Sequence, residues 1–361
     1  MKECYSNKIY FAPDWRKSNP YQWLLYKNLE NQNFKCIGIG KFSLNYIIHT
    51  IHGKGKGIVH LHWLYGLCKR NSHYTAVVLS VLILMAKLIL IRLFKNKIVF
   101  TNHNFGSHET KFKNLENFLT AFCIFISDSV VVHTKAGFDF IRTQYKIRPD
   151  KIWIIPHGNY IGYYENSIGR IEARNKLGLG QKEKVFLFFG QLREYKGVEE
   201  LIVAFKKCKK ENYRLIIAGK PQNDKIKTII DIASKNDSRI VTSLKFIQEE
   251  RVQCYFNACD IVVLPYKKIL SSGTILLALS FGKFIIAPKD GDAIYILSKS
   301  VSYLYKRNKK ISEEILEKSI KHHSNNYNFN KTLNLAQQYS WEKICLKYRK
   351  MYRHLLNNPR L

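Results

Sequence analysis

Short runs of apolar residues alternate along this chain with stretches in which apolar residues recur every three or four positions. The clearest run is Val185 to Phe189, which is typical of a strand buried on both faces of a parallel sheet. Helical spacing follows directly, so we expect an α/β fold with parallel, doubly wound sheets. The expected strands lie at residues 8–12, 34–39, 58–62, 97–101, 129–133 and 151–156, and then at 185–189, 213–219, 239–242, 260–264, 284–287 and 301–305.

The length of 361 residues exceeds what one ordinary core supports, which predicts two domains. After the strand at 151–156 the chain passes through His157 into a polar, glycine-bearing segment that runs to Gly169. We place the domain boundary there. We therefore expect one Rossmann-like domain at 1–160, a second at 161–338, and a C-terminal segment at 339–361 that is mostly helix.

Net charge is the extreme feature of the composition, with 59 Lys and Arg against 27 Asp and Glu, a balance of +32. Such a charge indicates a polyanionic partner, which can be nucleic acid, an anionic membrane surface or a phosphorylated substrate. The basic residues are mostly scattered lysines, and RNA-binding signatures with interleaved aromatics are absent. Charge alone therefore does not favour nucleic acid.

The eight cysteines stand singly, without a C-x-x-C pair or a zinc-type Cys/His spacing. They indicate reduced thiols in a cytoplasmic protein, and the N-terminal MKECYSNKIYFAP has no apolar core of a secretory signal. No D-x-D motif lies between strands, and we interpret Asp290-Gly291-Asp292 as a turn. We expect no metal and no cofactor.

The most apolar stretch, Ala76 to Phe94, resembles a membrane span. Lys87 and Arg92 interrupt it, and the uninterrupted part is too short to cross a bilayer. We expect a helix packed between a sheet and the surface, whose basic neighbours face anionic lipid headgroups.

An anion site is predicted at Lys184 to Gly197, which reads KVFLFFGQLREYKG. Gly190 ends the strand, and Arg193 and Lys196 precede the next helix. Backbone N–H groups at a helix start favour an anion, and Arg193 can grip phosphate oxygens bidentately while Lys196 adds a point charge. A diphosphate fits this arrangement. The alternative is that both cations are solvated surface groups.

A second anion cradle is predicted where Ser272, Gly273 and Thr274 open an apolar helix, because small residues there expose backbone amides. The alternative is an ordinary well-capped helix. The domain lacks G-x-G-x-x-G after its first strand, which argues against a nicotinamide enzyme. Two cradles in one domain favour a nucleotide diphosphate.

Polar residues follow the strand at 97–101, among them His103, Asn104 and Glu109. Ligands of open α/β sheets bind outside the carboxyl ends of the strands, so we expect chemistry at this edge, with Asp14 and His157 as further candidates. The alternative is that the polar side chains only cap a loop.

Several motifs in order resemble the two-domain, GT-B type glycosyltransferases, close to family 4 and its capsule and exopolysaccharide members. They are G-x-x-R-x-x-K-G at 190–197, IIAG ending at 219, DIVVLP at 260–265, and SGT at 272–274, preceded by HLHW at 60–63, TNHNFGSHE at 101–109 and IIPHGNY at 154–160. The resemblance implies two Rossmann-like domains facing each other across a cleft, with the helix that begins near Trp341 crossing back to the first domain.

By this resemblance Arg193 and Lys196 hold the donor diphosphate and Gly273 and Thr274 cradle its distal phosphate. The region of Phe246 and Ile247 meets the base, and His103 lies close to the transferring sugar.

One departure concerns two glutamates that many family 4 enzymes carry eight positions apart, where this chain has Ile269 and Leu277. Retention or inversion of configuration is therefore open. Inversion needs a general base for the acceptor hydroxyl, and Glu109, His103 and Asp14 are candidates. We favour Glu109 as the base and His103 for donor positioning.

The resulting hypothesis is a hexosyltransferase that moves a sugar from a nucleotide diphosphate sugar to a lipid-linked or polysaccharide acceptor in surface polysaccharide synthesis, peripheral on the inner face of the plasma membrane. Two alternatives stay open: a sugar-nucleotide-binding protein without catalysis, and a basic nucleic-acid-binding protein.

Overall fold

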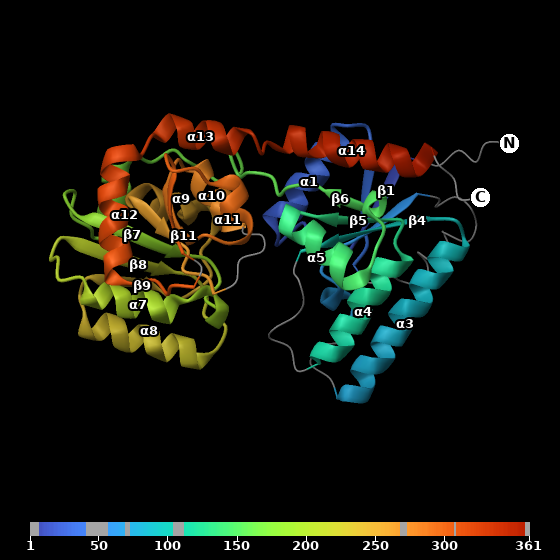
Figure 1. Ribbon diagram of the computed structural model, residues 1–361, viewed down its shortest axis with the longest axis horizontal. Helices are drawn as coiled ribbons and strands as arrows, with labels where there is room; N and C mark the ends of the chain where they lie inside the picture. The colour runs from blue at the N-terminus through green and yellow to red at the C-terminus, as the bar shows by residue number, and fades with distance from the viewer. Residues whose placement is uncertain are drawn as a thin grey trace. The chain divides into compact units, whose positions relative to one another are not determined.

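A computed structural model describes residues 7–40, 57–68, 73–103, 112–267, 273–306 and 308–357. The chain divides into two compact units, the first made of Met1–Gly158 with Trp341–Leu361 and the second of Asn159–Ser340. The sequence placed the boundaries after residues 160 and 338. Each unit holds one parallel sheet of six strands among the described residues (Figure 1).

The sheet of the first unit has the strand order β2-β1-β3-β4-β5-β6. Its strands are β1 (Lys8–Ala12), β2 (Lys35–Gly38), β3 (Ile58–Leu61), β4 (Lys97–Asn102), β5 (Ser129–Val132) and β6 (Ile152–Ile154). Its helices are α1 (Pro20–Glu30), α3 (Tyr74–Leu93), α4 (Lys113–Ile126), α5 (Lys135–Tyr145) and α14 (Trp341–Asn357), with short 3-10 turns η1 (Leu64–Leu67) and η2 (Pro149–Lys151).

Helix α1 begins where the sequence predicts. Asn19 is its N-cap, with its side chain accepting from the Gln22 N–H, and Pro20 is the first helical residue. Helix α14 packs against α1, where the Tyr21 and Tyr348 hydroxyls lie 3.0 Å apart. Arg349 of α14 also donates to Gln32, which follows α1. The C-terminal helix is therefore part of the first unit.

Helix α3 covers the first sheet with one face, and Val81, Leu84 and Leu88 are buried in the core there. The predicted helix at this stretch is confirmed. By length and apolar composition alone, α3 is the one helix in the described part of the chain that could cross a membrane.

The sheet of the second unit has the order β12-β11-β10-β7-β8-β9. Its strands are β7 (Lys184–Phe189), β8 (Tyr213–Ala218), β9 (Ile240–Ser243), β10 (Ile261–Val263), β11 (Phe284–Pro288) and β12 (Ser302–Tyr305). Its helices are α6 (Arg170–Lys176), α7 (Val198–Lys207), α8 (Asp224–Asn236), α9 (Glu249–Ala258), α10 (Gly273–Ser280), α11 (Gly291–Ile296), α12 (Glu313–Asn326) and α13 (Phe329–Gln337), with the 3-10 turn η3 (Glu194–Lys196).

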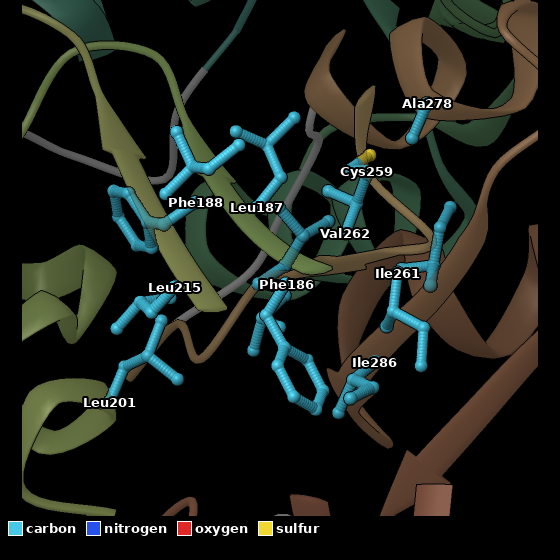
Figure 2. Packing of buried hydrophobic residues seen from close by; sticks show 14 of the residues in the cluster. Phe186, Leu187, Phe188, Leu201, Leu215, Cys259, Ile261, Val262, Ala278 and Ile286 are labelled. Carbon is cyan, nitrogen blue, oxygen red and sulfur yellow. The ribbon is translucent and has the colours of Figure 1, made fainter. Parts of the chain in front are cut away.

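Strand β7 lies inside this sheet, between β10 and β8, as its apolar run predicts. Phe186 and Phe188 on β7 are buried (Figure 2). Phe186 meets the ring of Phe205 on α7 edge to face. Each such ring contributes roughly 1.5–3 kcal/mol by leaving water. Burial therefore fixes β7 and the loop that follows it.

The interpretation of Asp290-Gly291-Asp292 as a turn was wrong. Asp290 is the N-cap of α11, and its Oδ1 accepts from the Gly291 N–H at 2.9 Å. An Asp-Gly pair favours both turns and helix starts, and the apolar residues Ala293, Ile294 and Ile296 that decide for the helix come later in the sequence.

Candidate active site

Four histidines lie at the carboxyl ends of successive strands in the first unit. His62 follows β3, His103 follows β4, His133 follows β5 and His157 comes after β6. Parallel strands bring these ends to one edge of the sheet, and the rings contact one another: the centroids of His62 and His103 lie 5.2 Å apart, those of His103 and His133 5.0 Å, and those of His133 and His157 5.9 Å. We call these residues the four-histidine cluster.

Hydrogen bonds connect three of these rings in a chain. Nδ1 of His62 lies 2.9 Å from Nε2 of His103, and Nδ1 of His103 lies 3.2 Å from Nε2 of His133. The chain ends at the Ile155 carbonyl, which is 2.8 Å from Nδ1 of His133.

The carbonyl sets the direction of this chain, because a carbonyl oxygen can only accept. Nδ1 of His133 therefore carries the hydrogen, and its Nε2 accepts from Nδ1–H of His103. Nε2 of His103 in turn accepts from Nδ1–H of His62. All three imidazoles are neutral in this arrangement, and both ring nitrogens of His103 are engaged within the chain.

Burial keeps the cluster neutral. It lowers the pKa of His133 to about 4 and that of His157 to about 3. The pKa values of His62 and His103 also lie well below the ordinary value, first because of burial and then because of the neighbouring histidines. Desolvation disfavours the imidazolium, so the cluster is uncharged at neutral pH.

Aromatic rings hold the cluster in place. The ring of Trp63 stacks on His103 with the centroids 4.3 Å apart and the planes at 12°. The ring of Tyr21 on α1 meets His103 edge-on at 5.3 Å and contacts Trp341 of α14 at the same separation. Gly158 leaves room for Trp341, since a Cβ there would lie 2.3 Å from the indole. Helices α1 and α14 thus fix the orientation of His103.

The structure brings together two of the predicted residues of this unit, His103 and His157, and places Asp14 in a separate ion pair. Asp14 accepts two hydrogen bonds from the Arg16 guanidinium, at 2.9 and 2.8 Å, which lower the pKa of that carboxyl. A carboxylate so paired is a weak base. Asn104 and Glu109 lie outside the described residues.

Sequence reasoning missed His62, His133 and Tyr21 as members of the site. The two histidines stand in HLHW and SVVVH, each at the end of an expected strand, and that shared position was the available signal. Tyr21 carries no comparable signal, because it is one of several aromatic residues on an amphipathic helix.

In the second unit, three loops meet at the carboxyl edge of the sheet without side chains between them. A Cβ at Gly219, after β8, would lie 1.9 Å from the carbonyl oxygen of Gly190, after β7. A Cβ at Gly197 would lie 2.2 Å from the carbonyl oxygen of Pro265, after β10. All three glycines have positive φ, so only glycine gives these close approaches without strain.

The predicted cations lie beside this junction. Nζ of Lys196 is 5.6 Å from the centroid of the Tyr266 ring. A Cβ built on Gly190 would lie 3.5 Å from the same Nζ atom. The Tyr266 hydroxyl donates to Oγ1 of Thr274, at the start of α10, over 3.4 Å. The Arg193 guanidinium donates two hydrogen bonds, 3.0 and 2.8 Å long, to Oε1 of Gln191, a neutral partner.

The structure thus brings Gly190, Lys196 and Thr274 to one edge of the second sheet, with Gly273 as the first residue of α10. Phe246, after β9, is 64% exposed, while the neighbouring Ile247 packs against the core. Leu277 is buried among apolar residues, at a position where the resemblance leads to a glutamate. Ser272 and Ile269 lie outside the described residues.

Within the described ranges, no group of three or more His, Cys, Asp or Glu side chains is arranged to hold a metal ion. The nitrogens that link His62, His103 and His133 point at one another rather than at a common centre. The expectation of no metal and no cofactor stays a prediction.

The fold corresponds to that of solved glycosyltransferases. The structure of HepE from Anabaena in complex with UDP superposes with a TM-score of 0.72, at 16% sequence identity, over 96% of this chain and all of that one. This confirms the predicted fold class, two Rossmann-like α/β domains of the GT-B type.

Residues 169–339, nearly all of the second unit, match the family model of glycosyl transferases group 1. A GDP-mannose:glycolipid 4-beta-D-mannosyltransferase of Xanthomonas campestris is 32% identical over 148 residues, which are 41% of this chain and 40% of the relative. An uncharacterized glycosyltransferase of Methanocaldococcus jannaschii is 27% identical over 286 residues, which are 74% of this chain and 70% of that protein.

The chain spans about two fifths of the length of the Xanthomonas mannosyltransferase that it matches. The resemblance to GT-B glycosyltransferases that the sequence motifs indicate is confirmed.

Proposed function

We propose that this protein transfers a hexosyl residue from a nucleotide diphosphate sugar to a lipid-linked or polysaccharide acceptor. The observation that carries the proposal is the junction of Gly190, Gly219 and Pro265 with Lys196 beside it, inside the segment that matches the group 1 family model. Bare backbone and a cation at the carboxyl edge of a parallel sheet suit a diphosphate. HepE, with the same fold, is seen in complex with UDP.

In this proposal Arg193 and Lys196 bind the donor diphosphate, and the backbone N–H groups of Gly273 and Thr274 cradle its distal phosphate. Phosphate oxygens give Arg193 a stronger, charge-assisted pair than the neutral Gln191 amide does. The segment of Phe246 and Ile247 meets the base.

The first unit supplies the chemistry at the acceptor. The acceptor hydroxyl gives its proton to a base while its oxygen bonds to the anomeric carbon, and the bond from that carbon to the diphosphate breaks. Glu109 is the proposed base. His103 positions the donor sugar rather than taking a proton, because its nitrogens are engaged by His62 and His133.

The acceptor class is proposed from two observations. The basic balance of +32 suits an anionic membrane surface, and the Xanthomonas relative is named for a glycolipid acceptor. The protein would then work in surface polysaccharide synthesis, such as that of a capsule, on the cytoplasmic side of the plasma membrane. It would need neither metal nor nucleic acid.

A second candidate is a sugar-nucleotide-binding protein without catalysis. The buried Leu277, which stands where the resemblance leads to a glutamate, favours this candidate. The two candidates agree on binding and differ on transfer.

A thermal-shift panel of UDP-, GDP-, CMP- and dTDP-sugars tests the binding step. One nucleotide class should raise Tm, since a ligand stabilises the state that binds it. The Arg193→Ala/Lys196→Ala variant should lose that shift. The control Lys206→Ala/Lys207→Ala removes the same charge from the exposed end of α7 and should keep it. A full shift in the first variant overturns the diphosphate assignment.

A further inference from the structure

Helix α3 is apolar on two opposite faces. Its buried residues Val77, Val81, Leu84, Leu88 and Ile91 recur at three- and four-residue spacing and pack inward. The large apolar residues Leu79, Leu82, Ile83, Leu90 and Leu93 lie on the opposite side of the helix and are 58, 53, 46, 40 and 69% exposed. The solvent side of a surface helix is ordinarily polar, so the second apolar face is unexplained by folding.

Helix α4 also exposes large apolar residues. The two helices run side by side in the first unit (Figure 1), and Phe118 and Phe125 of α4, two turns apart, are 53 and 60% exposed. We call these two residues, together with Leu79, Leu82, Ile83, Leu90 and Leu93 of α3, the α3–α4 outer face.

Basic residues flank this face. Lys87 and Arg92 belong to α3, Lys95 follows it, and Lys113 begins α4. Arg92 is half-buried and donates to the Ile126 carbonyl. Residues 74–95 contain no Asp or Glu, and within α4 the one acidic residue is Glu116. An apolar face with a cationic border complements a membrane surface with anionic headgroups.

We propose that the α3–α4 outer face docks this protein on the surface of an anionic lipid bilayer. The inner face of α3 is part of the core of the first unit, so the helix lies on the bilayer rather than crossing it. A second copy of the chain is a poorer occupant, because a two-fold interface would bring the same basic borders together.

The inference deepens the proposed function and rests on it for its purpose, which is to bring the active site to a lipid-linked acceptor. Docking itself needs no donor or acceptor. A protein that binds vesicles but no nucleotide sugar would overturn the proposed function and leave this inference standing. A protein that binds a nucleotide sugar but no vesicles would overturn this inference and leave the proposed function standing.

The test is co-sedimentation with phosphatidylcholine vesicles that contain or lack phosphatidylglycerol. The wild type should sediment with the anionic vesicles, and Leu79→Gln/Leu82→Gln/Leu90→Gln should bind them at least about tenfold more weakly. The matched control, Ile171→Gln/Val203→Gln/Ile232→Gln, replaces residues of the second unit that are 67, 58 and 53% exposed, and should bind like the wild type. The exposed positions let both variants fold, which circular dichroism checks.

Three results would overturn the inference. The first is wild-type binding that does not depend on phosphatidylglycerol, and the second is an equal loss of binding in the two triple variants. The third is a wild-type protein that does not bind vesicles but forms a dimer in analytical ultracentrifugation, which the α3 variant abolishes.

Discussion

Nδ1 of His62 lies 2.9 Å from Nε2 of His103. The Ile155 carbonyl beyond His133 makes His62 the donor of this pair, so His103 is held as a neutral ring with one defined tautomer. Nε2 of His62, at the far end of the chain, is buried and has no hydrogen-bond partner among the described residues. Burial opposes protonation of His62 and of His103, which keeps His103 neutral.

Replacing His133 should slow transfer without weakening donor binding much. His133→Leu removes the acceptor that orients His103, and kcat should fall by about tenfold or more while the donor KM changes little. His133→Gln keeps a polar group that can accept near the position of Nε2 and should recover part of the rate. Steady-state kinetics measure both values.

The control for this pair is His354→Gln, on the exposed side of α14, which should behave like the wild type. A folded His133→Leu protein with the wild-type kcat would contradict the positioning role of the chain.

The histidine cluster should make stability fall in mild acid. The pKa of His133 is lowered from 6.5 to about 4, so between these pH values the unfolded chain binds a proton that the folded chain excludes. The stability that neutral His133 contributes is complete above pH 6.5 and declines as the pH falls toward 4. The folded state should lose about 2 kcal/mol of this stability between about pH 7 and about pH 5.

Urea unfolding of the wild type and of His133→Leu at these two pH values measures the difference. The variant should lose less stability on acidification. Equal losses in the two proteins would show that folding does not lower the pKa of His133.

The glycine junction should be intolerant of a side chain. Gly178 has a φ of +67° but open space around its Cβ position, so Gly178→Ala should cost only about 1 kcal/mol of unfolding free energy. Gly219→Ala should cost more than about 3 kcal/mol, because its Cβ would strike the Gly190 carbonyl. Denaturant titration compares the two, and similar costs would contradict the packing of these loops.

Asp260 should be essential to the second unit. Its Oδ2 accepts from the fully buried Arg174 at 3.1 Å and from the Val185 N–H at 2.8 Å, at the start of β7. Asp260→Asn leaves a buried guanidinium without its counter-charge and should cost about 3 kcal/mol. Asp139→Asn, in the exposed pair with Lys135, should cost less than about 0.5 kcal/mol. Thermal unfolding that does not separate these variants would contradict this role.

The fold was predictable because buried parallel strands have a continuous apolar signature, as in Val185 to Phe189. The proximity of Gly190 and Lys196 was predictable because both follow such a strand directly and precede a helix. Their role, with Arg193, as an anion site stays a prediction.

The histidine chain was not predictable, because it depends on side-chain directions at the ends of three strands that lie 41 and 30 residues apart in sequence. The role of Tyr21 likewise arises only when α1 and α14 pack together. The second apolar face of α3 was visible in the sequence, but its exposure was not.

The most direct measurement is transfer of a radiolabelled sugar from the stabilising nucleotide sugar into the lipid extract of bacterial membranes. The wild type should place label in the organic phase, and Arg193→Ala/Lys196→Ala should place none there while Lys206→Ala/Lys207→Ala matches the wild type. Label that stays in the nucleotide sugar with the wild type, or equal transfer by the Arg193 and Lys196 variant, would contradict the proposed glycosyltransferase.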